Sequence, residues 1–396
     1  MTERLYFTDS HLIEFETVVA ACAPAGDRFE ASLVATAFYP TGGGQPHDIG
    51  TLGNRRVVDV VDREGEGILH VLDGPLDPGA RVRGLVDWSR RFDHMQQHSG
   101  QHILSAAFEA VCKARTESFH LGAGSCTIDL NRVVSPTEIA AAEDEANRVV
   151  WLDSEVRICF ADADEAPDLA LRKESTRTGT LRLIEMAGFD RSACGGTHVA
   201  RTGAVGLIGI LGWEKFKGGT RIEFVCGARA LGRIREWRDV FSATSRVLSV
   251  LPGALAPAIE RLQGENKTLG RTVRDLQAQL AVHKAAELVA SAGPPVDGRI
   301  VIACALEGWD APGLKGIATA AAASPGVCIA VFSATSPALV VVASAPGVGL
   351  DASAVLKTLV ARFGGKGGGK PEFAQGGGLL GRVEEIVALG RQFLAR

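Results

Sequence analysis

Two short segments, far apart in the chain, carry side chains that could hold a metal ion. His98 and His102 are four residues apart, so on a helix both imidazoles project from one face. Cys194 and His198 are also four apart, and the two glycines between them allow a tight backbone turn. Three imidazoles and one thiolate form a donor set that suits zinc and disfavours magnesium or calcium. The pattern predicts one Zn²⁺ per chain.

Two other interpretations of these residues stay open. With His94 also in step, the histidine segment could be the polar face of a helix. Cys194 could instead be a nucleophile with His198 or His102 as its base, which predicts a covalent intermediate and no metal dependence. We rank the nucleophile lower because two helical histidines have no duty in such a mechanism, whereas a metal site uses all four residues.

A third segment, Thr36-Ala-Phe-Tyr-Pro-Thr-Gly-Gly-Gly-Gln45, ends an expected strand in a run of glycines. Such a run requires unusual backbone dihedral angles or the close approach of another backbone or a ligand. A purely structural hairpin turn is the alternative, in which Thr36, Thr41 and Gln45 are incidental surface residues.

A fourth segment, Phe363 to Gly378, is rich in glycine and basic residues. Its glycines would let a phosphate backbone approach the main chain, and the nearby cations, set against the single acid Glu372, are Lys357, Arg362, Lys366 and Lys370. Gly364 to Lys370 also fits a P-loop pattern, but Pro371 stands where a Ser or Thr would ligate magnesium, so ATP binding is not expected. A solvated loop is the remaining alternative.

The elements that position these segments indicate an α+β protein in four parts. Residues 1–89 form a small β-barrel-like domain with the glycine turn, 90–230 an α+β domain with the zinc site, 231–293 a helical connector, and 294–396 a small α/β domain. The expected strands are 14–21, 30–37, 56–62, 68–72, 81–86, 155–160, 181–186, 205–211, 221–225, 300–305, 327–332 and 339–342, and helices are expected from Arg90, from an N-cap at Thr137 to Val150, and from Gly227 to Val250.

Residues 259–283 carry apolar side chains at alternating spacings of three and four, with Asn266 at one core position. A single Asn often fixes the register of a coiled coil. The series predicts either a homodimer through this helix or the C-terminal domain, or a helix that lies on its own domain.

Composition limits the class of protein. The 396 residues are 46% hydrophobic and 22% charged with a net charge of −4, which excludes a disordered chain and a generally basic nucleic-acid coat protein. Eight cysteines without a signal peptide favour reduced thiols, and no apolar run is long enough to span a membrane. A cytoplasmic location and no membrane partner are expected.

Together the segments resemble the editing module of alanyl-tRNA synthetase and its freestanding relatives, the AlaX proteins. The matches are the Thr36 to Gln45 segment, His98-Ser-Gly-Gln-His102, Cys194-Gly-Gly-Thr-His198, and Lys217 to Arg229 with Arg221-Ile-Glu-Phe. The glycine-rich C-terminal segment is similar to the domain shared with DHH-type phosphoesterases, where it binds RNA. In the family, the residues matching His98, His102, Cys194 and His198 hold zinc.

The resemblance implies ATP-independent hydrolysis of the ester joining serine to tRNA(Ala), with glycine as the second candidate amino acid. The residue matching Thr36 hydrogen-bonds the seryl hydroxyl. We expect Gln45 to orient the ester or a water, Gly43 and Gly44 to offer N–H groups to the oxyanion, and Lys217, Arg221, Lys366 and Lys370 to bind tRNA.

The long AlaX form is indicated because no aminoacylation domain precedes the barrel, so editing is expected to act in trans. Zinc could polarise the ester carbonyl, hold the amino group or activate water. Two other functions stay open: a non-catalytic, zinc-containing tRNA-binding protein, and a phosphoesterase. The phosphoesterase is disfavoured because Asp93-His94 is followed by Met95 rather than a second histidine.

Overall fold

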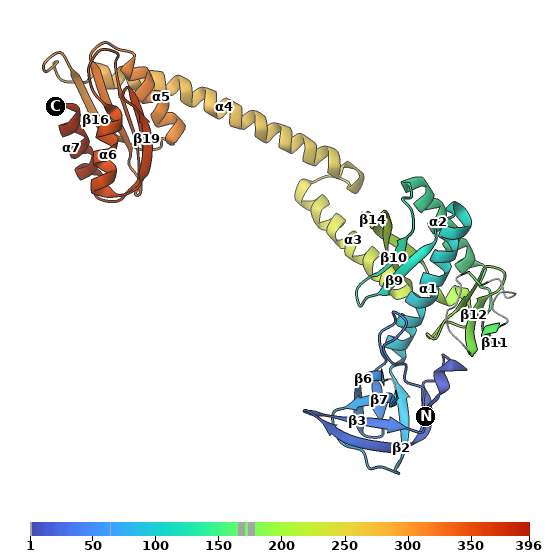
Figure 1. Ribbon diagram of the computed structural model, residues 1–396. Coiled ribbons are helices and arrows are strands. Elements are labelled where there is room, and N and C mark those ends of the chain that lie inside the picture. The colour runs from blue at the N-terminus through green and yellow to red at the C-terminus, as the bar shows by residue number, and fades with distance from the viewer. Residues whose placement is uncertain (1, 64, 165–170, 173–178) are drawn as a thin grey trace. The chain divides into compact units, whose positions relative to one another are not determined.

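The structure is a computed structural model that describes residues 2–63, 65–164, 171–172 and 179–396. The chain forms two compact units, residues 1–244 and 245–396, and both mix helices with sheets, which confirms the α+β class (Figure 1). The finer division into four parts stays a prediction. Within the described ranges, no helix has the length and apolar character needed to cross a membrane.

Six antiparallel strands near the N-terminus close into a barrel, in the order β2-β3-β7-β6-β5-β8. The expected strand 30–37 is wrong in one respect, because β3 ends at Leu33 and β4 leaves the barrel to pair in parallel with β1. The bounds are β1 Glu3–Arg4, β2 Glu14–Ala25, β3 Arg28–Leu33, β4 Ala35–Thr36, β5 Gly50–Leu52, β6 Arg55–Arg63, β7 Gly67–Leu72 and β8 Arg81–Val86, with a 3-10 turn η1 at Leu5–Phe7.

Helix α1 (Trp88–Cys112) is the long central helix of the first unit and contacts α2 and both sheets. It starts two residues before the expected Arg90, because the Asp87 carboxylate accepts a hydrogen bond from the Arg90 N–H and caps the first turn. Lys113, with φ 55°, ends it. Most of its residues from Met95 to Phe108 are buried, so its histidines lie inside the unit rather than on a solvated polar face.

Two antiparallel sheets surround α1. The first has the order β14-β15-β10-β9 and the second β11-β12-β13. Strands β9, β10 and β13 were not predicted, although β10 alternates buried and partly buried residues. The bounds are β9 Thr116–Leu121, β10 Cys126–Leu130, β11 Val156–Asp162, β12 Thr180–Met186, β13 Asp190–Ala193, β14 Ile208–Phe216 and β15 Gly219–Cys226, with a 3-10 turn η3 at Thr202–Val205.

Helix α2 (Pro136–Trp151) packs against α1 and β14. Its N-cap is Ser135 and not the expected Thr137, because Ser135 forms a capping box with Glu138 and Pro136 occupies the first helical position.

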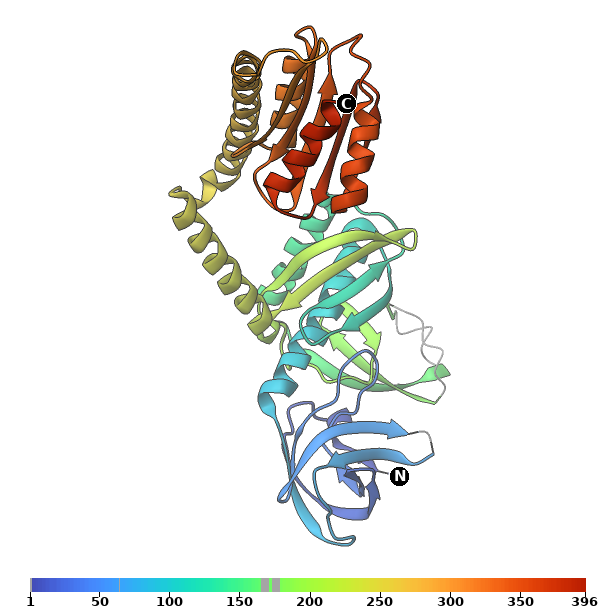
Figure 2. The same ribbon diagram turned by 90° about the vertical axis from the view of Figure 1, so that its left-hand side faces the viewer.

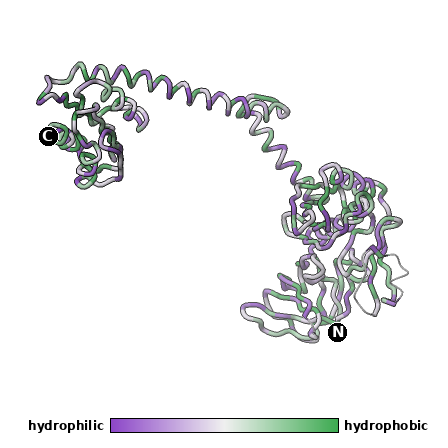
Figure 3. The backbone as a smooth tube through the Cα atoms, turned by 45° about the horizontal axis from the view of Figure 1, so that its top comes forward, coloured by the Kyte–Doolittle hydropathy of each residue, from purple (hydrophilic) through white to green (hydrophobic). Residues whose placement is uncertain are grey.

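Two long helices follow, α3 (Gly227–Leu248) and α4 (Leu255–Ala290), separated by the short 3-10 turn η4 (Pro252–Ala254). Apolar and polar residues alternate along α4 (Figure 3). Ala281 and Ala285 near its end are buried together with side chains of α5 (Ala311–Ala322), whereas Leu269 of the apolar series is 63% exposed. Only the last part of α4 therefore lies on its own domain, and a homodimer through the exposed series stays a prediction.

The C-terminal unit has one five-stranded mixed sheet in the order β16-β17-β18-β20-β19. Two separate hydrophobic clusters cover its two faces, one with α6 and α7 and the other with α5 and the end of α4 (Figure 2). The glycine-rich segment is the hairpin β19–β20 and not a loop; no helix follows β19, which also excludes a P-loop. The bounds are β16 Ile300–Leu306, β17 Val327–Ser333, β18 Ala338–Ser344, α6 Ala352–Phe363, β19 Lys366–Lys370, β20 Phe373–Leu379 and α7 Val383–Leu394.

Candidate metal centre

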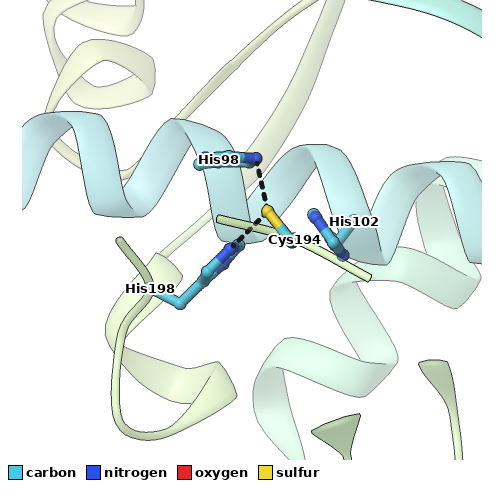
Figure 4. Close-up of side chains that lie close together, drawn as sticks. All are labelled: His98, His102, Cys194 and His198. Carbon is cyan, nitrogen blue, oxygen red and sulfur yellow. Dashed lines mark hydrogen bonds between the residues drawn. The ribbon is translucent and has the colours of Figure 1, made fainter. Parts of the chain in front are cut away.

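The four residues expected to bind zinc meet in the first unit (Figure 4). The ligand atoms of His98, His102, Cys194 and His198 all lie within 4.8 Å of one another. The Cys194 Sγ lies 3.4 Å from His98 Nε2 and 3.3 Å from His198 Nε2. Among the described residues this is the one cluster of its kind.

Local structure explains how the two segments converge. His98 and His102 lie one turn apart on the buried face of α1, and the loop after β13 brings Cys194 and His198 to them. A Cβ at Gly196 would lie only 2.2 Å from the His98 ring, so glycine is required for the loop to pack this closely.

Each histidine has its Nδ1 held by a different residue. The Nδ1 of His98 donates to Gln45 Oε1 at 2.8 Å, and that of His102 to Asp190 Oδ2 at 3.0 Å. The Nδ1 of His198 is hydrogen-bonded to the Ser99 hydroxyl at 3.1 Å. The three Nε2 atoms are thus left for the shared centre, the arrangement found around protein-bound zinc.

The cluster favours an ionised thiol. Burial opposes ionisation, but His98, His198 and a hydrogen bond from His102 hold the pKa of the Cys194 thiol well below its usual value. Burial likewise opposes a charge on His102, yet Asp190 and Cys194 raise its pKa to about 9. Burial lowers the pKa of His198 to about 3. The thiolate is available as a ligand, whereas His102 must lose a proton before its Nε2 can bind a cation.

The spacing of the donor atoms fits zinc. Tetrahedral zinc with N and S ligands at about 2.0 and 2.3 Å requires ligand atoms roughly 3.3–3.6 Å apart. The two measured sulfur–nitrogen distances, 3.4 and 3.3 Å, are close to this range. These two pairs are spaced as in a tetrahedral site, and all four ligand atoms lie within 4.8 Å of one another.

Two buried arginines hold the surrounding backbone. Arg182 of β12 donates from Nε to the Phe7 carbonyl and from Nη1 to the carbonyls of Cys194 and Gly196. Arg91 of α1 forms an ion pair with Asp48, and both side chains are fully buried. These residues and Asp190 were not predicted from the sequence. The one available signal was a charged residue within an apolar stretch, as at Arg182.

The structure brings only part of the glycine segment to the cluster. Gly43 and Gly44 lie at an exposed turn tip, and a Cβ on Gly44 would lie 2.6 Å from Phe119, whose ring is 5.9 Å from that of His98. Thr36 lies on β4 instead, fully buried beside the barrel strand β7. Its hydroxyl is 2.8 Å from His70 Nε2 and accepts from the Phe38 N–H, and the described residues show no contact between Thr36 and the four ligands.

The expected tRNA-binding residues lie on two hairpins, one in each unit. Lys217 and Arg221 belong to the β14–β15 hairpin, where Arg221 stacks on Phe216 at 3.6 Å and forms an ion pair with Asp129. Lys366 and Lys370 are the exposed first and last residues of the edge strand β19.

Two family models match the chain. Residues 181–223, which include Cys194 and His198, match the threonyl and alanyl tRNA synthetase second additional domain. Residues 297–396 match the DHHA1 domain.

Whole-chain relatives include two kinds of protein. The alanine–tRNA ligase of Methanoculleus marisnigri is 33% identical over 98% of this chain, which spans only 43% of that ligase. The alanyl-tRNA editing protein AlaX-L of Pyrococcus horikoshii is 32% identical over 95% of this chain and 94% of its own length. The alanyl-tRNA editing protein Aarsd1 of Rattus norvegicus is 34% identical over 72% of this chain and 73% of its own. With this coverage, the chain belongs to the alanyl-tRNA editing proteins of the long AlaX form.

Proposed function

We propose that this chain is a deacylase that hydrolyses the ester between tRNA(Ala) and a wrongly attached serine or glycine. The observation that carries the proposal is the buried cluster of one thiol and three imidazoles, on a chain that matches AlaX-L over nearly the full length of both. It would act in trans, on tRNA charged elsewhere.

The substrate follows from the chemistry of error correction. A synthetase pocket for alanine cannot exclude glycine, and it rejects an added hydroxyl only about a hundredfold, so a second, hydrolytic site has to remove the errors. The second site must spare alanine. Thr36 is the proposed selector, because alanine offers no hydroxyl to hydrogen-bond.

Zinc is the proposed cofactor, held by His98, His102, Cys194 and His198. When bound, it would supply a Lewis acid at the ester or at the substrate's amino group. The residues around it hold the ligands: Asp190 accepts a hydrogen bond from His102 Nδ1, and Arg182 donates hydrogen bonds to two carbonyls of the ligand loop. Gly43 and Gly44 could offer N–H groups to the developing oxyanion from the exposed turn tip.

A non-catalytic, zinc-containing tRNA-binding protein is the second candidate. Four protein ligands would fill a tetrahedral zinc site, as in structural zinc sites. This candidate predicts that tRNA binds without ester hydrolysis.

The Cys194→Ala variant tests the proposal against a matched change, Cys159→Ala, on strand β11. Zinc content and serine release from Ser-tRNA(Ala) are measured for both variants. We expect Cys194→Ala to lose the metal and at least a hundredfold in rate, and Cys159→Ala to keep both. A Cys194→Ala protein that keeps zinc and full activity would refute the proposed site.

A further inference from the structure

We propose that Gln45 is a positioning residue of the metal centre, which fixes the orientation and tautomer of His98 instead of contacting substrate. The inference rests on the zinc site proposed above. Through Gln45, the glycine turn after β4 would then hold a metal ligand of helix α1, His98, in place.

The turn holds the Gln45 backbone rigidly. Gly42 and Gln45 exchange two backbone hydrogen bonds, with N···O distances of 3.0 and 2.9 Å. Gly43 and Gly44 between them have φ values of 53° and 78°. Positive φ at both central residues defines a type I′ turn, which glycine adopts without strain. This turn explains Gly43 and Gly44 without a ligand.

The side chain of Gln45 turns inward and is fully buried. Its Oε1 accepts from His98 Nδ1 at 2.8 Å and from the Thr197 N–H at 3.1 Å, and its Nε2 donates to the Thr197 hydroxyl at 2.8 Å. Both lone pairs of Oε1 are thus in use. A water could reach this oxygen only by displacing one of these bonds, and the one remaining group of the amide is the second N–H of Nε2, on a side chain that is fully buried.

The bond to His98 determines where that histidine carries its proton. An amide oxygen cannot donate, so His98 Nδ1 must carry a proton, and in the neutral imidazole Nε2 then keeps the lone pair that faces Cys194 Sγ. Through Thr197 the same amide is joined to the loop that carries Cys194 and His198. One side chain therefore links the barrel turn, α1 and the ligand loop.

Three variants and a control test this role. Gln45→Met removes the acceptor at similar volume, Gln45→Asn shortens the amide by one methylene, and Gln45→Glu keeps an acceptor oxygen. Gln96→Met is the control. Like Gln45, Gln96 has a buried side-chain amide; it lies on α1, is hydrogen-bonded to backbone groups, and contacts none of the four ligands. Zinc affinity is measured by competition with a chromogenic chelator, and ligand geometry from the absorption spectrum of the Co²⁺-substituted protein.

We expect Gln45→Met and Gln45→Asn to lower zinc affinity by about 10- to 100-fold and to change the Co²⁺ spectrum. Gln45→Glu should restore affinity to within a few-fold of the unmodified chain, and Gln96→Met should leave it unchanged. If either Gln45→Met or Gln45→Asn fails to fold, the other variant still tests whether the amide supports zinc binding.

Wild-type zinc affinity and Co²⁺ spectrum in Gln45→Met or Gln45→Asn, together with a higher KM for Ser-tRNA(Ala), would overturn the inference and make Gln45 a substrate ligand. Failure of the unmodified chain to bind zinc would instead refute the proposed metal site itself. The two failures are therefore distinguishable.

Discussion

At the scale of single residues, each histidine of the cluster uses its two nitrogens for different tasks. One nitrogen is anchored by Gln45, Asp190 or Ser99, and the other faces the common centre. The sequence identifies the four ligand residues, because the H-x-x-x-H segment and the CGGTH segment each place two of them within five consecutive residues. It does not identify the anchors, since Gln45 and Asp190 lie 53 and 88 residues from their histidines.

Thr36 allows a test of substrate selection. If its hydroxyl recognises serine, Thr36→Val should reduce the preference for Ser-tRNA(Ala) over Ala-tRNA(Ala) by roughly five- to tenfold, the equivalent of about one neutral hydrogen bond. Competitive deacylation of the two substrates measures the ratio. A lower melting temperature with an unchanged ratio would contradict this role and leave Thr36 as a structural partner of His70.

His70 makes the stability of the chain depend on pH. Burial lowers its pKa to about 4, from 6.5 in an unfolded chain. Between these values the unfolded state binds the proton more readily, so stability falls as pH drops from 6.5 toward 4. At pH 5, the free energy of unfolding is lower by about 2 kcal/mol than at neutral pH because of His70.

His70→Phe should remove this contribution. Urea unfolding at pH 7 and pH 5, in the presence of a chelator, compares the variant with the unmodified chain. The pH-dependent loss of unfolding free energy should be smaller in the variant by about 2 kcal/mol. Equal losses in both proteins would show that His70 does not titrate on unfolding.

Among the elements, a pair of glycine variants can distinguish a role of the glycine turn at the site from the general cost of placing alanine at a left-handed position. Gly44 has φ 78° and lies against Phe119, whereas Gly26 has φ 63° and open space around it. Replacing either by Ala should cost about 1–2 kcal/mol of stability through left-handed strain. Gly44→Ala should also displace Phe119 and slow deacylation at least tenfold, whereas Gly26→Ala should keep its rate. Equal rates in the two variants would contradict a role for the turn at the site.

The elements also show where prediction from sequence succeeds. Helices α1 and α3 and most barrel strands were predicted within a few residues, because capping residues and apolar periodicity are local signals. Strands β9 and β10 were missed, although β9 carries the Phe119 that contacts His98. The glycine-rich hairpin β19–β20 was not predicted as a pair of strands, because glycine has low strand propensity and its pairing depends on neighbouring strands.

At the scale of the whole molecule, the C-terminal unit is expected to contribute tRNA affinity rather than chemistry. Double replacement of Lys366 and Lys370 by Ala should weaken tRNA binding and reduce the slope of log K against log salt by up to about 2. A charge-matched double variant of Lys267 and Arg271 on α4 is the control. Equal salt slopes in both variants would place the phosphate contacts elsewhere.

The number of phosphate contacts sets that slope for the unmodified chain, whose net charge is −4. A mildly acidic protein with a few local basic residues should show a shallow salt dependence, corresponding to a few phosphate contacts. A slope equivalent to about ten contacts would contradict binding through these small patches.

The central claim is tested most directly by release of labelled serine from Ser-tRNA(Ala), with Ala-tRNA(Ala) as the comparison. Three samples are needed: the purified chain, the chain after chelator treatment, and the treated chain with zinc restored. We predict that serine is released, that alanine is spared, and that activity disappears with the metal and returns with it. Binding of tRNA without serine release, or release that is unaffected by metal removal, would contradict a zinc-dependent editing deacylase.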